Sequence, residues 1–193
     1  MKKTLATVAA GIIITTALVT ACSAPTPTPT SASAATSGAD LAGFDLSNTS
    51  VREVIDTLDR TNEDRANGPR GSVRQDQLIL TTGGSQRAMP LPADQTYISI
   101  APYINQTHEC FNHNLATCQG EQVDKTFTVT ITDSTGKELV KTTEKTYPNG
   151  FFGFWVPRDI RGTIAITGQG KSDSVTFGTS AGDPTCLTTL QLT

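Results

Sequence analysis

One segment near the N-terminus has the hydrophobic spacing of an amphipathic helix. Apolar residues recur at intervals of three and four from Val51 to Leu58, which predicts one buried face. Ser50 and Glu53 form a capping box at its start, and Asn67-Gly68-Pro69 is expected to end it. We therefore assign residues 48–68 to this helix. Its charged residues are predicted to lie on the opposite, solvent-facing side: Arg52, Asp56, Asp59 and Arg60. The apolar stripe is expected to pack on the body of the protein. Packing on a second copy of itself, which would form a homodimer, is the alternative.

From residue 72 onward the pattern is typical of strands. Short alternating or apolar runs are separated by turn residues at intervals of roughly 8–12 residues, which favours an antiparallel sandwich. The predicted strands are residues 77–81, 96–100, 125–131, 138–143, 150–157, 162–167 and 172–177. Asp133-Ser134-Thr135-Gly136 predicts a hairpin between the third and fourth of them. We predict a mainly β fold, an antiparallel β-sandwich-like metal-binding domain with a short N-terminal helical region.

The first residues are typical of an export signal. Lys2 and Lys3 precede an apolar run that is too short for a membrane span and ends at Leu18-Val19-Thr20-Ala21-Cys22. This end resembles a bacterial lipobox, so Cys22 is the expected lipidation site, with an ordinary signal peptide as the alternative. The following residues are rich in Pro, Thr and Ser and predict an extended spacer. We expect an extracytoplasmic protein of the cell envelope, held at the cell membrane by a lipid anchor.

The chain divides into four predicted segments. These are a lipoprotein signal peptide (1–21), the lipidated cysteine and spacer (22–40), an N-terminal helix and strand region (41–92), and a β-rich metal-binding domain (93–193). Cleavage after residue 21 would remove two of the 15 basic residues and leave 13 against 18 acidic ones, a net charge of −5. No run of Lys or Arg is present, so nucleic acid is not an expected partner.

Nearly all of the soft metal ligands of the chain lie in one stretch. The pattern H-x-C-x2-H-x4-C contains both histidines and two cysteines, and a third cysteine lies near the C-terminus: His108, Cys110, His113, Cys118 and Cys186. Thiolates and imidazoles favour copper and zinc, and three thiolates suit Cu(I). Zinc fits by ligand count, but the paired C-x2-4-C knuckles typical of structural zinc sites are absent. An iron–sulfur cluster usually needs four cysteines.

Two other interpretations of the cysteines stay open. A structural disulfide between Cys110 and Cys118 would close a nine-residue loop, worth about 2.6 kcal/mol in the chain-entropy treatment. It would leave Cys186 outside the bond and give the neighbouring histidines no role. A thiol redox enzyme is the third interpretation, since two thiols can deliver two electrons as they close a disulfide.

Four segments carry a more specific signal. They are Tyr97-Ile98-Ser99-Ile100-Ala101-Pro102-Tyr103, Thr107-His108-Glu109-Cys110, Cys118-Gln119-Gly120-Glu121 and Asp183-Pro184-Thr185-Cys186-Leu187-Thr188-Thr189. Together they resemble the CueP family of periplasmic copper-binding proteins over roughly residues 40–193. The resemblance implies that Cys110, Cys118 and Cys186 bind Cu(I), that His108 and His113 belong to the metal-binding segment, and that the protein contributes to copper resistance.

We expect a copper-binding lipoprotein that sequesters copper for tolerance or supplies it to an acceptor metalloprotein. Such a protein binds its metal tightly and has no turnover. A thiol-based Cu(II) or Fe(III) reductase of the cell envelope is the alternative function. A structural lipoprotein with a disulfide-bonded β-domain is the third.

Overall fold

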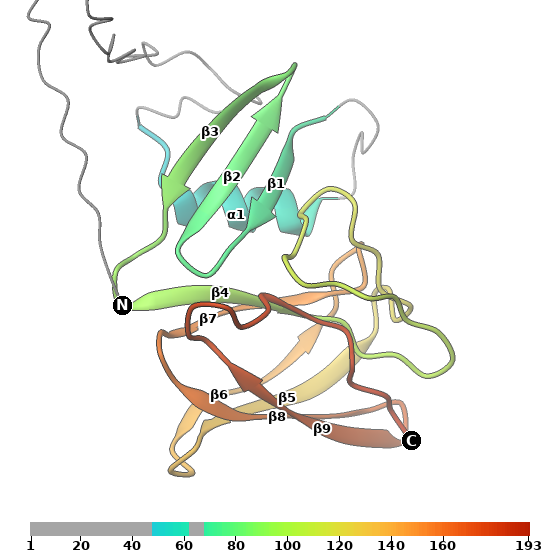
Figure 1. Cartoon of the computed structure of the whole chain (residues 1–193). Helices are drawn as coiled ribbons and strands as arrows, with labels where there is room; N and C mark the ends of the chain where they lie inside the picture. Colours follow the sequence, from blue (N-terminus) through green and yellow to red (C-terminus); the bar gives the residue numbers. More distant parts are fainter. Residues whose placement is uncertain (1–47, 62–67) are drawn as a thin grey trace, which may run out of the picture. The chain divides into compact units, whose positions relative to one another are not determined.

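Strands form most of the secondary structure, and the prediction of a mainly β chain with one short helix is confirmed (Figure 1). The computed structural model describes residues 48–61 and 68–193. The elements are α1 (Val51–Arg60), β1 (Arg70–Val73), β2 (Gln77–Thr82), β3 (Ser85–Pro90), β4 (Gln95–Ile100), β5 (Thr126–Asp133), β6 (Glu138–Lys145), β7 (Phe152–Pro157), β8 (Arg161–Gly168), β9 (Lys171–Gly178) and β10 (Cys186–Leu187). The predicted signal peptide, Cys22 and the spacer lie outside the described residues. Among those described, no helix is long and apolar enough to cross a membrane.

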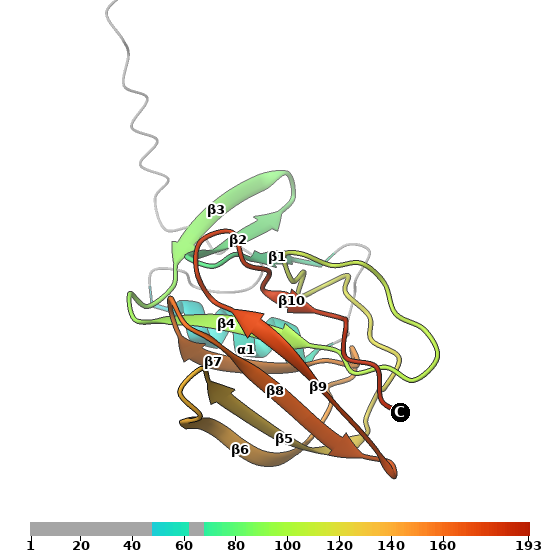
Figure 2. The ribbon, with the colours of Figure 1, turned by 60° about the horizontal axis from the view of Figure 1, so that its bottom comes forward.

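The strands form three sheets. Their orders are β1-β2-β3, β10-β4-β7 and β6-β5-β8-β9. All pairs are antiparallel except one, because β10 runs parallel to β4 (Figure 2). The seven predicted strands correspond to β2 and β4–β9. Sequence analysis missed β1 and β10, which are short, and β3, whose side chains are mostly polar and exposed.

Two of these sheets share the larger hydrophobic core. One face of β4 and β7 packs on the alternating inward residues of β5, β8 and β9, as the period of two along each strand predicts. The fully buried aliphatic members are Ile98, Ile100, Val129, Ile131, Val156, Ile164 and Ile166, with Leu190 and Leu192 from the C-terminal segment. This core gives β4 and β7 a fixed platform, and β10 adds to it at the edge of β4.

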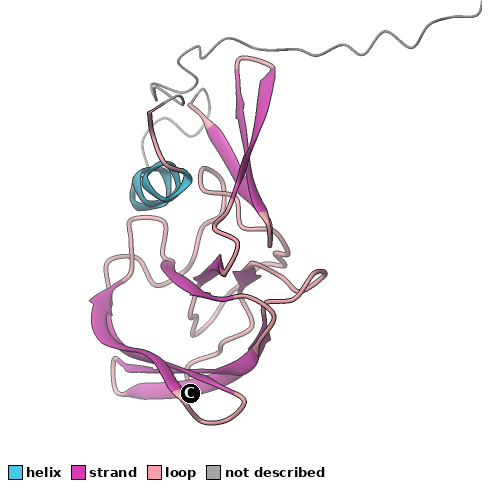
Figure 3. Cartoon of the chain, turned by 90° about the vertical axis from the view of Figure 1, so that its left-hand side faces the viewer, coloured by secondary structure: helices cyan, strands magenta, loops and turns pink. Residues whose placement is uncertain are grey.

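The helix packs on a second core formed with the β1-β2-β3 sheet (Figures 1 and 3). Val54 and Ile55 are fully buried there with Leu78 and Leu80 of β2 and with Leu115 of the segment between β4 and β5. The apolar stripe therefore packs on the body of the same chain, as expected. A homodimer would have to use another surface. The predicted boundary at residues 92 and 93 stays a prediction.

The helix differs from the prediction at its C-terminal end. Ser50 caps its N-terminus by accepting from the backbone N–H of Glu53, as predicted, but the helix ends at Arg60 because Thr61 is extended, with φ −107° and ψ 146°. The assignment of Asp59 to the solvent-facing side is wrong, since this residue is fully buried. Asp59 lies four residues after Ile55, so the helical period places it on the buried face. The predicted residues 62–67 lie outside the description.

Candidate metal centre

The parallel pairing of β10 with β4 brings the end of the chain to the cysteine-rich loop. Cys186 is in register with Ser99, whose backbone N–H donates to the carbonyl of Thr185 at 2.8 Å. On its other side, Thr185 and Cys186 both donate backbone hydrogen bonds to the carbonyl of Phe111, at 2.9 and 3.2 Å. Backbone geometry thus fixes Cys186 beside the segment that carries Cys110.

The three cysteine side chains meet in one place. Cys110 and Cys186 form a disulfide, and the sulfur of Cys118 lies 3.4 Å from the sulfur of Cys110. The Cys118 sulfur also accepts a hydrogen bond from the backbone N–H of Asn114 at 3.3 Å. A disulfide between Cys110 and Cys118, which the sequence left open as an alternative, is therefore wrong. The register of β10 supplies a partner from 76 residues further along the chain, which sequence spacing does not reveal.

His113 lies next to the sulfurs of Cys118 and Cys186 and is fully buried. Its Nδ1 is 3.8 Å from the sulfur of Cys186, and its Nε2 is 2.8 Å from Oδ1 of Asp59. The ring of Phe151 packs against the imidazole with centroids 4.6 Å apart. The ligand atoms of His113, Cys118 and Cys186 all lie within 4.8 Å of one another, and we call these three residues the inner group.

A second triad shares one cysteine with the inner group. The ligand atoms of His108, Cys110 and Cys118 also lie within 4.8 Å of one another, and we call these the outer group. His108 is exposed, whereas every member of the inner group is buried. Two members of the outer group, His108 and Cys110, border a cavity of about 380 Å³, whose other lining residues are Tyr103, Thr107, Glu109, Thr188 and Thr189. Solvent therefore reaches Cys110 from the side of His108, whereas Cys118 and Cys186 are buried.

A buried polar network contacts Nε2 of His113, the ring nitrogen that faces away from Cys186. The sequence pattern did not predict this network. Asp59 of α1 receives hydrogen bonds at its carboxylate from the Tyr97 hydroxyl at 2.6 Å and from the Asn149 amide at 2.8 Å. The same amide donates to the backbone carbonyl of Asp59 at 3.0 Å. Gly153 makes room for this arrangement, because a Cβ at that position would overlap the Tyr97 hydroxyl. The helical period of α1 was the available signal for Asp59.

The charges of this network shift one another's protonation. Burial alone would lower the pKa of His113, but the charge and hydrogen bond of Asp59 outweigh it and raise this pKa to about 9. Burial opposes ionisation of Asp59 and Cys118 as well. The interactions with His113 nonetheless bring both of these pKa values below their usual levels. Near neutral pH the network therefore consists of a carboxylate, an imidazolium and a thiol that ionises readily, and thiolate is the form that binds metals.

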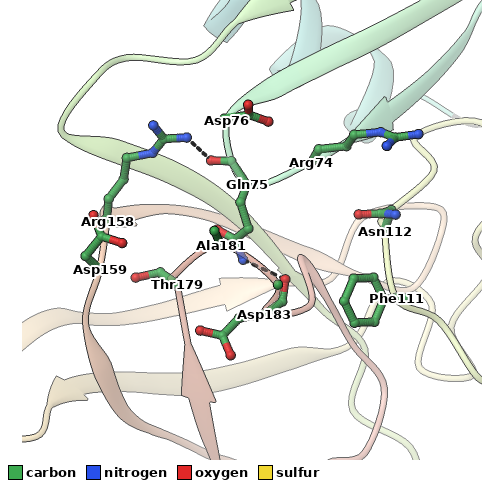
Figure 4. Close-up of a pocket in the computed structure, with 11 residues that line it drawn as sticks. Arg74, Gln75, Asp76, Phe111, Asn112, Arg158, Asp159, Thr179, Ala181 and Asp183 are labelled. Carbon is green, nitrogen blue, oxygen red and sulfur yellow. Dashed lines mark hydrogen bonds between the residues drawn. The ribbon is translucent and has the colours of Figure 1, made fainter.

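A larger cavity lies on the other side of Phe111 and has different chemistry (Figure 4). Its volume is about 470 Å³ and its lining mixes Arg74 and Arg158 with three aspartates. Arg158 donates to the backbone carbonyl of Gln75, whose side-chain amide donates to the carbonyl of Asp183 at 3.0 Å. No cysteine or histidine of the described chain lines this cavity, so it offers no ligand for a soft metal.

The five residues singled out from the sequence thus lie together, four of them buried or partly buried around the sulfurs and His108 at the exposed edge. Metal binding by them stays a prediction at this point. The donor set suits a soft metal, since three sulfurs and two imidazoles converge from two distant segments.

Comparison with known proteins gives a consistent result. The family model described as "Periplasmic copper-binding protein CueP" matches residues 53–191. A crystal structure of S.CueP is 40% identical to this chain, with a TM-score of 0.73, and the match covers 77% of this chain and 91% of that one. The comparison with curated proteins gave no match.

Proposed function

The chain belongs to the CueP family of periplasmic copper-binding proteins, and from this premise we propose that it binds Cu(I) through Cys110, Cys118 and Cys186. The periplasmic location of the family supports an extracytoplasmic site of action. The observation that carries the proposal is the convergence of three sulfurs and a buried imidazole from segments 76 residues apart. A purely structural disulfide requires neither the third sulfur nor the histidine.

The chemistry of the donors favours Cu(I) over zinc. Thiolates are soft ligands, and Cu(I) accepts two or three of them, whereas zinc is bound by four ligands in a tetrahedron. The inner and outer groups each combine two sulfurs with one imidazole nitrogen and share the sulfur of Cys118. This arrangement supplies several sets of three donors but no paired zinc knuckle. Zinc is the less favoured alternative.

Binding through three thiolates requires the disulfide to be open. Two electrons from a thiol reductant and two protons convert the Cys110–Cys186 bond into two thiols, which then lose their protons as the metal binds. Because β10 and the carbonyl of Phe111 hold the backbone on both sides of Cys186, the sulfurs stay close after reduction. Cu(I) would reach them from the cavity beside His108, which we propose as the first contact for the incoming ion.

A titration tests this proposal. The fully reduced mature domain is titrated with Cu(I) against a competing chromogenic chelator, in parallel with Cys186→Ser and Cys118→Ser variants. We expect one equivalent to bind tightly and either substitution to weaken binding by at least about tenfold. Ala101→Ser is the matched control, because it places a hydroxyl in the same buried cluster without removing a sulfur. Unchanged affinity in both cysteine variants would refute the proposal.

Reduction of Cu(II) is a second candidate function, supported by the disulfide with a third sulfur 3.4 Å away. Closing the Cys110–Cys186 bond from two thiols releases two electrons and two protons, enough to convert two Cu(II) ions to two Cu(I) ions. Without added reductant, the reduced protein should therefore produce at most two Cu(I) per molecule. Continued production with a thiol reductant, lost on Cys110→Ser, would identify a reductase. A stoichiometric limit under both conditions would identify a binding protein.

We propose further that the protein is tethered by lipidation of Cys22, with the spacer extending the domain from the membrane. Its copper would then be kept for tolerance or passed to an acceptor metalloprotein. Labelling with a fatty-acid analogue tests the tether, and Cys22→Ser should abolish the label and release the protein from the membrane fraction. Persistent labelling of Cys22→Ser would exclude this site. The oligomeric state is tested by sedimentation.

A further inference from the structure

Asp59 is a buried carboxylate, and its hydrogen-bond partners require it to act as an acceptor. An ionised carboxylate inside a protein is costly unless its oxygens are fully hydrogen-bonded. Asp59 is fully buried, and the Tyr97 hydroxyl and the Asn149 amide both point hydrogens at it. The amide can only donate through this nitrogen, so the carboxylate acts as an acceptor. The contact from Nε2 of His113 at 2.8 Å completes the set, and that nitrogen must be the donor.

The position of this hydrogen bond determines which ring nitrogen faces the sulfurs. With a proton held on Nε2 by Asp59, the opposite nitrogen, Nδ1, is directed at the sulfur of Cys186, 3.8 Å away. Phe151 packs against the ring, and the backbone N–H of His113 donates to the Thr185 hydroxyl at 3.0 Å. Asp59 and Phe151 therefore hold the ring, and the Thr185 hydroxyl holds the backbone that carries it. Metal-bound histidines in proteins are commonly oriented by a carboxylate in this way.

We propose that Asp59 is a positioning residue for the copper site, because its hydrogen bond to Nε2 of His113 directs Nδ1 toward the sulfurs of Cys118 and Cys186. The role rests on the proposed function, since it assumes that copper occupies the inner group. Asp59 itself touches no sulfur. It acts through His113, whose Nδ1 releases its proton to solvent as the metal binds and then serves as an additional donor to the metal. This gives α1, a helix of the second core, a part in a metal site whose cysteines pack in a separate cluster with Ala101 and Phe151.

The test uses Asp59→Asn, which keeps the size of the side chain and removes its charge. The first readout needs no metal. In ¹⁵N-labelled protein with the disulfide intact, at a pH above the pKa of about 9 of His113 where the ring is neutral, NMR of the imidazole shows which nitrogen keeps its proton. The chain has two histidines, so exposed His108 serves as the internal reference. We expect a protected Nε2–H in the wild-type protein and its loss, or a shift of the proton to Nδ1, in Asp59→Asn.

The second readout is the affinity of the reduced protein for Cu(I) in the chelator competition. We expect Asp59→Asn to weaken binding by about 10- to 100-fold. Tyr97→Phe is the first control, because it removes one hydrogen bond to Asp59 and leaves the contact with His113. Asp56→Asn is the second, since it makes the same change of charge on the same helix away from the site. Both controls should keep the Nε2–H signal, and Asp56→Asn should keep wild-type affinity.

Several results would overturn the inference. A wild-type ring protonated only at Nδ1 would do so without any variant, even if Asp59→Asn failed to fold. So would Asp59→Asn with an unchanged ring proton and unchanged affinity. Lower affinity with an unchanged ring proton would show that Asp59 is merely structural. Failure of the wild-type protein to bind Cu(I), with Nε2 protonated as expected, would instead refute the copper function and with it the role of Asp59 in that function.

Discussion

The ion pair between Asp59 and His113 should make folding stability depend on pH in a defined window. The pKa of His113 is 6.5 in an unfolded chain and about 9 in the folded protein. A raised pKa means that the stabilisation is complete below pH 6.5 and is lost as pH rises toward 9. At about 1.4 kcal/mol per pH unit, this interval corresponds to about 3 kcal/mol of the free energy of unfolding.

The ionisation of Cys118 also changes stability with pH and must be separated from that of His113. Its pKa is lowered in the folded protein, so its own contribution grows as pH rises toward its unfolded value and opposes that of His113. Cys118→Ser removes this opposing effect while the disulfide stays intact. The lowered pKa of Asp59 acts only below about pH 4 and the raised pKa of Tyr97 only above pH 10, so neither contributes in this window.

The assay is urea unfolding of the oxidised Cys118→Ser protein at about pH 6 and about pH 9.5, with the free energy extrapolated to water. We expect stability to fall by up to about 3 kcal/mol between these conditions, since Asp59 supplies the larger part of the raised pKa of His113 and the substituted Cys118 a smaller part. Adding Asp59→Asn to this variant should remove most of the change in the free energy of unfolding with pH. Adding Asp56→Asn should leave that change as it is. A free energy that stays constant to within about 0.5 kcal/mol in Cys118→Ser, or an equal decline with Asp59→Asn, would refute the reasoning.

Three further outcomes are expected. Peptide mapping of the oxidised protein should recover Cys110 linked to Cys186, and reduction should lower the free energy of unfolding by up to about 4.5 kcal/mol, since the bond closes a loop spanning 76 residues. Gly153→Ala should lower the melting temperature and weaken Cu(I) binding, because the added methyl group displaces the Tyr97 hydroxyl; Ala at this position with wild-type values of both would contradict the packing. His108→Ala should slow the uptake of copper from solution in stopped-flow experiments and change equilibrium Cu(I) affinity by less than about threefold, whereas equal losses in rate and affinity would make this residue an equilibrium ligand.

The alternation of strands was readable from the sequence because each central strand has one buried face. β5 and β8 illustrate this, since the second, fourth and sixth residues of each are buried. β10 was not readable, because two residues carry no period and its parallel partner lies far away in the sequence. The gathering of cysteines and histidines was evident from their spacing. The bond between Cys110 and Cys186 was not, because it depends on the register of that short strand.

The buried network around Asp59 shows that a charged residue in a helix does not always face solvent. The sequence-based prediction groups Asp59 with the other charged residues on the solvent-facing side, although the helical period places it on the same face as Ile55. A charge on the apolar face of a helix is a useful signal, since such a residue must find partners inside the protein. Here those partners are Tyr97, Asn149 and His113, which come from three other segments and could not be matched to Asp59 by spacing.

The location of Asp59 in the last turn of α1 has a consequence for the rate at which metal leaves. Helix ends open and close far more often than whole domains unfold, and each opening here would withdraw the carboxylate from His113. The rate at which copper dissociates would then depend on local opening at the end of α1 and not on breakage of the metal–sulfur bonds alone. A protein that bound α1 in its unravelled form would accelerate release without contacting the sulfurs, whereas bound copper would slow amide hydrogen exchange along the helix.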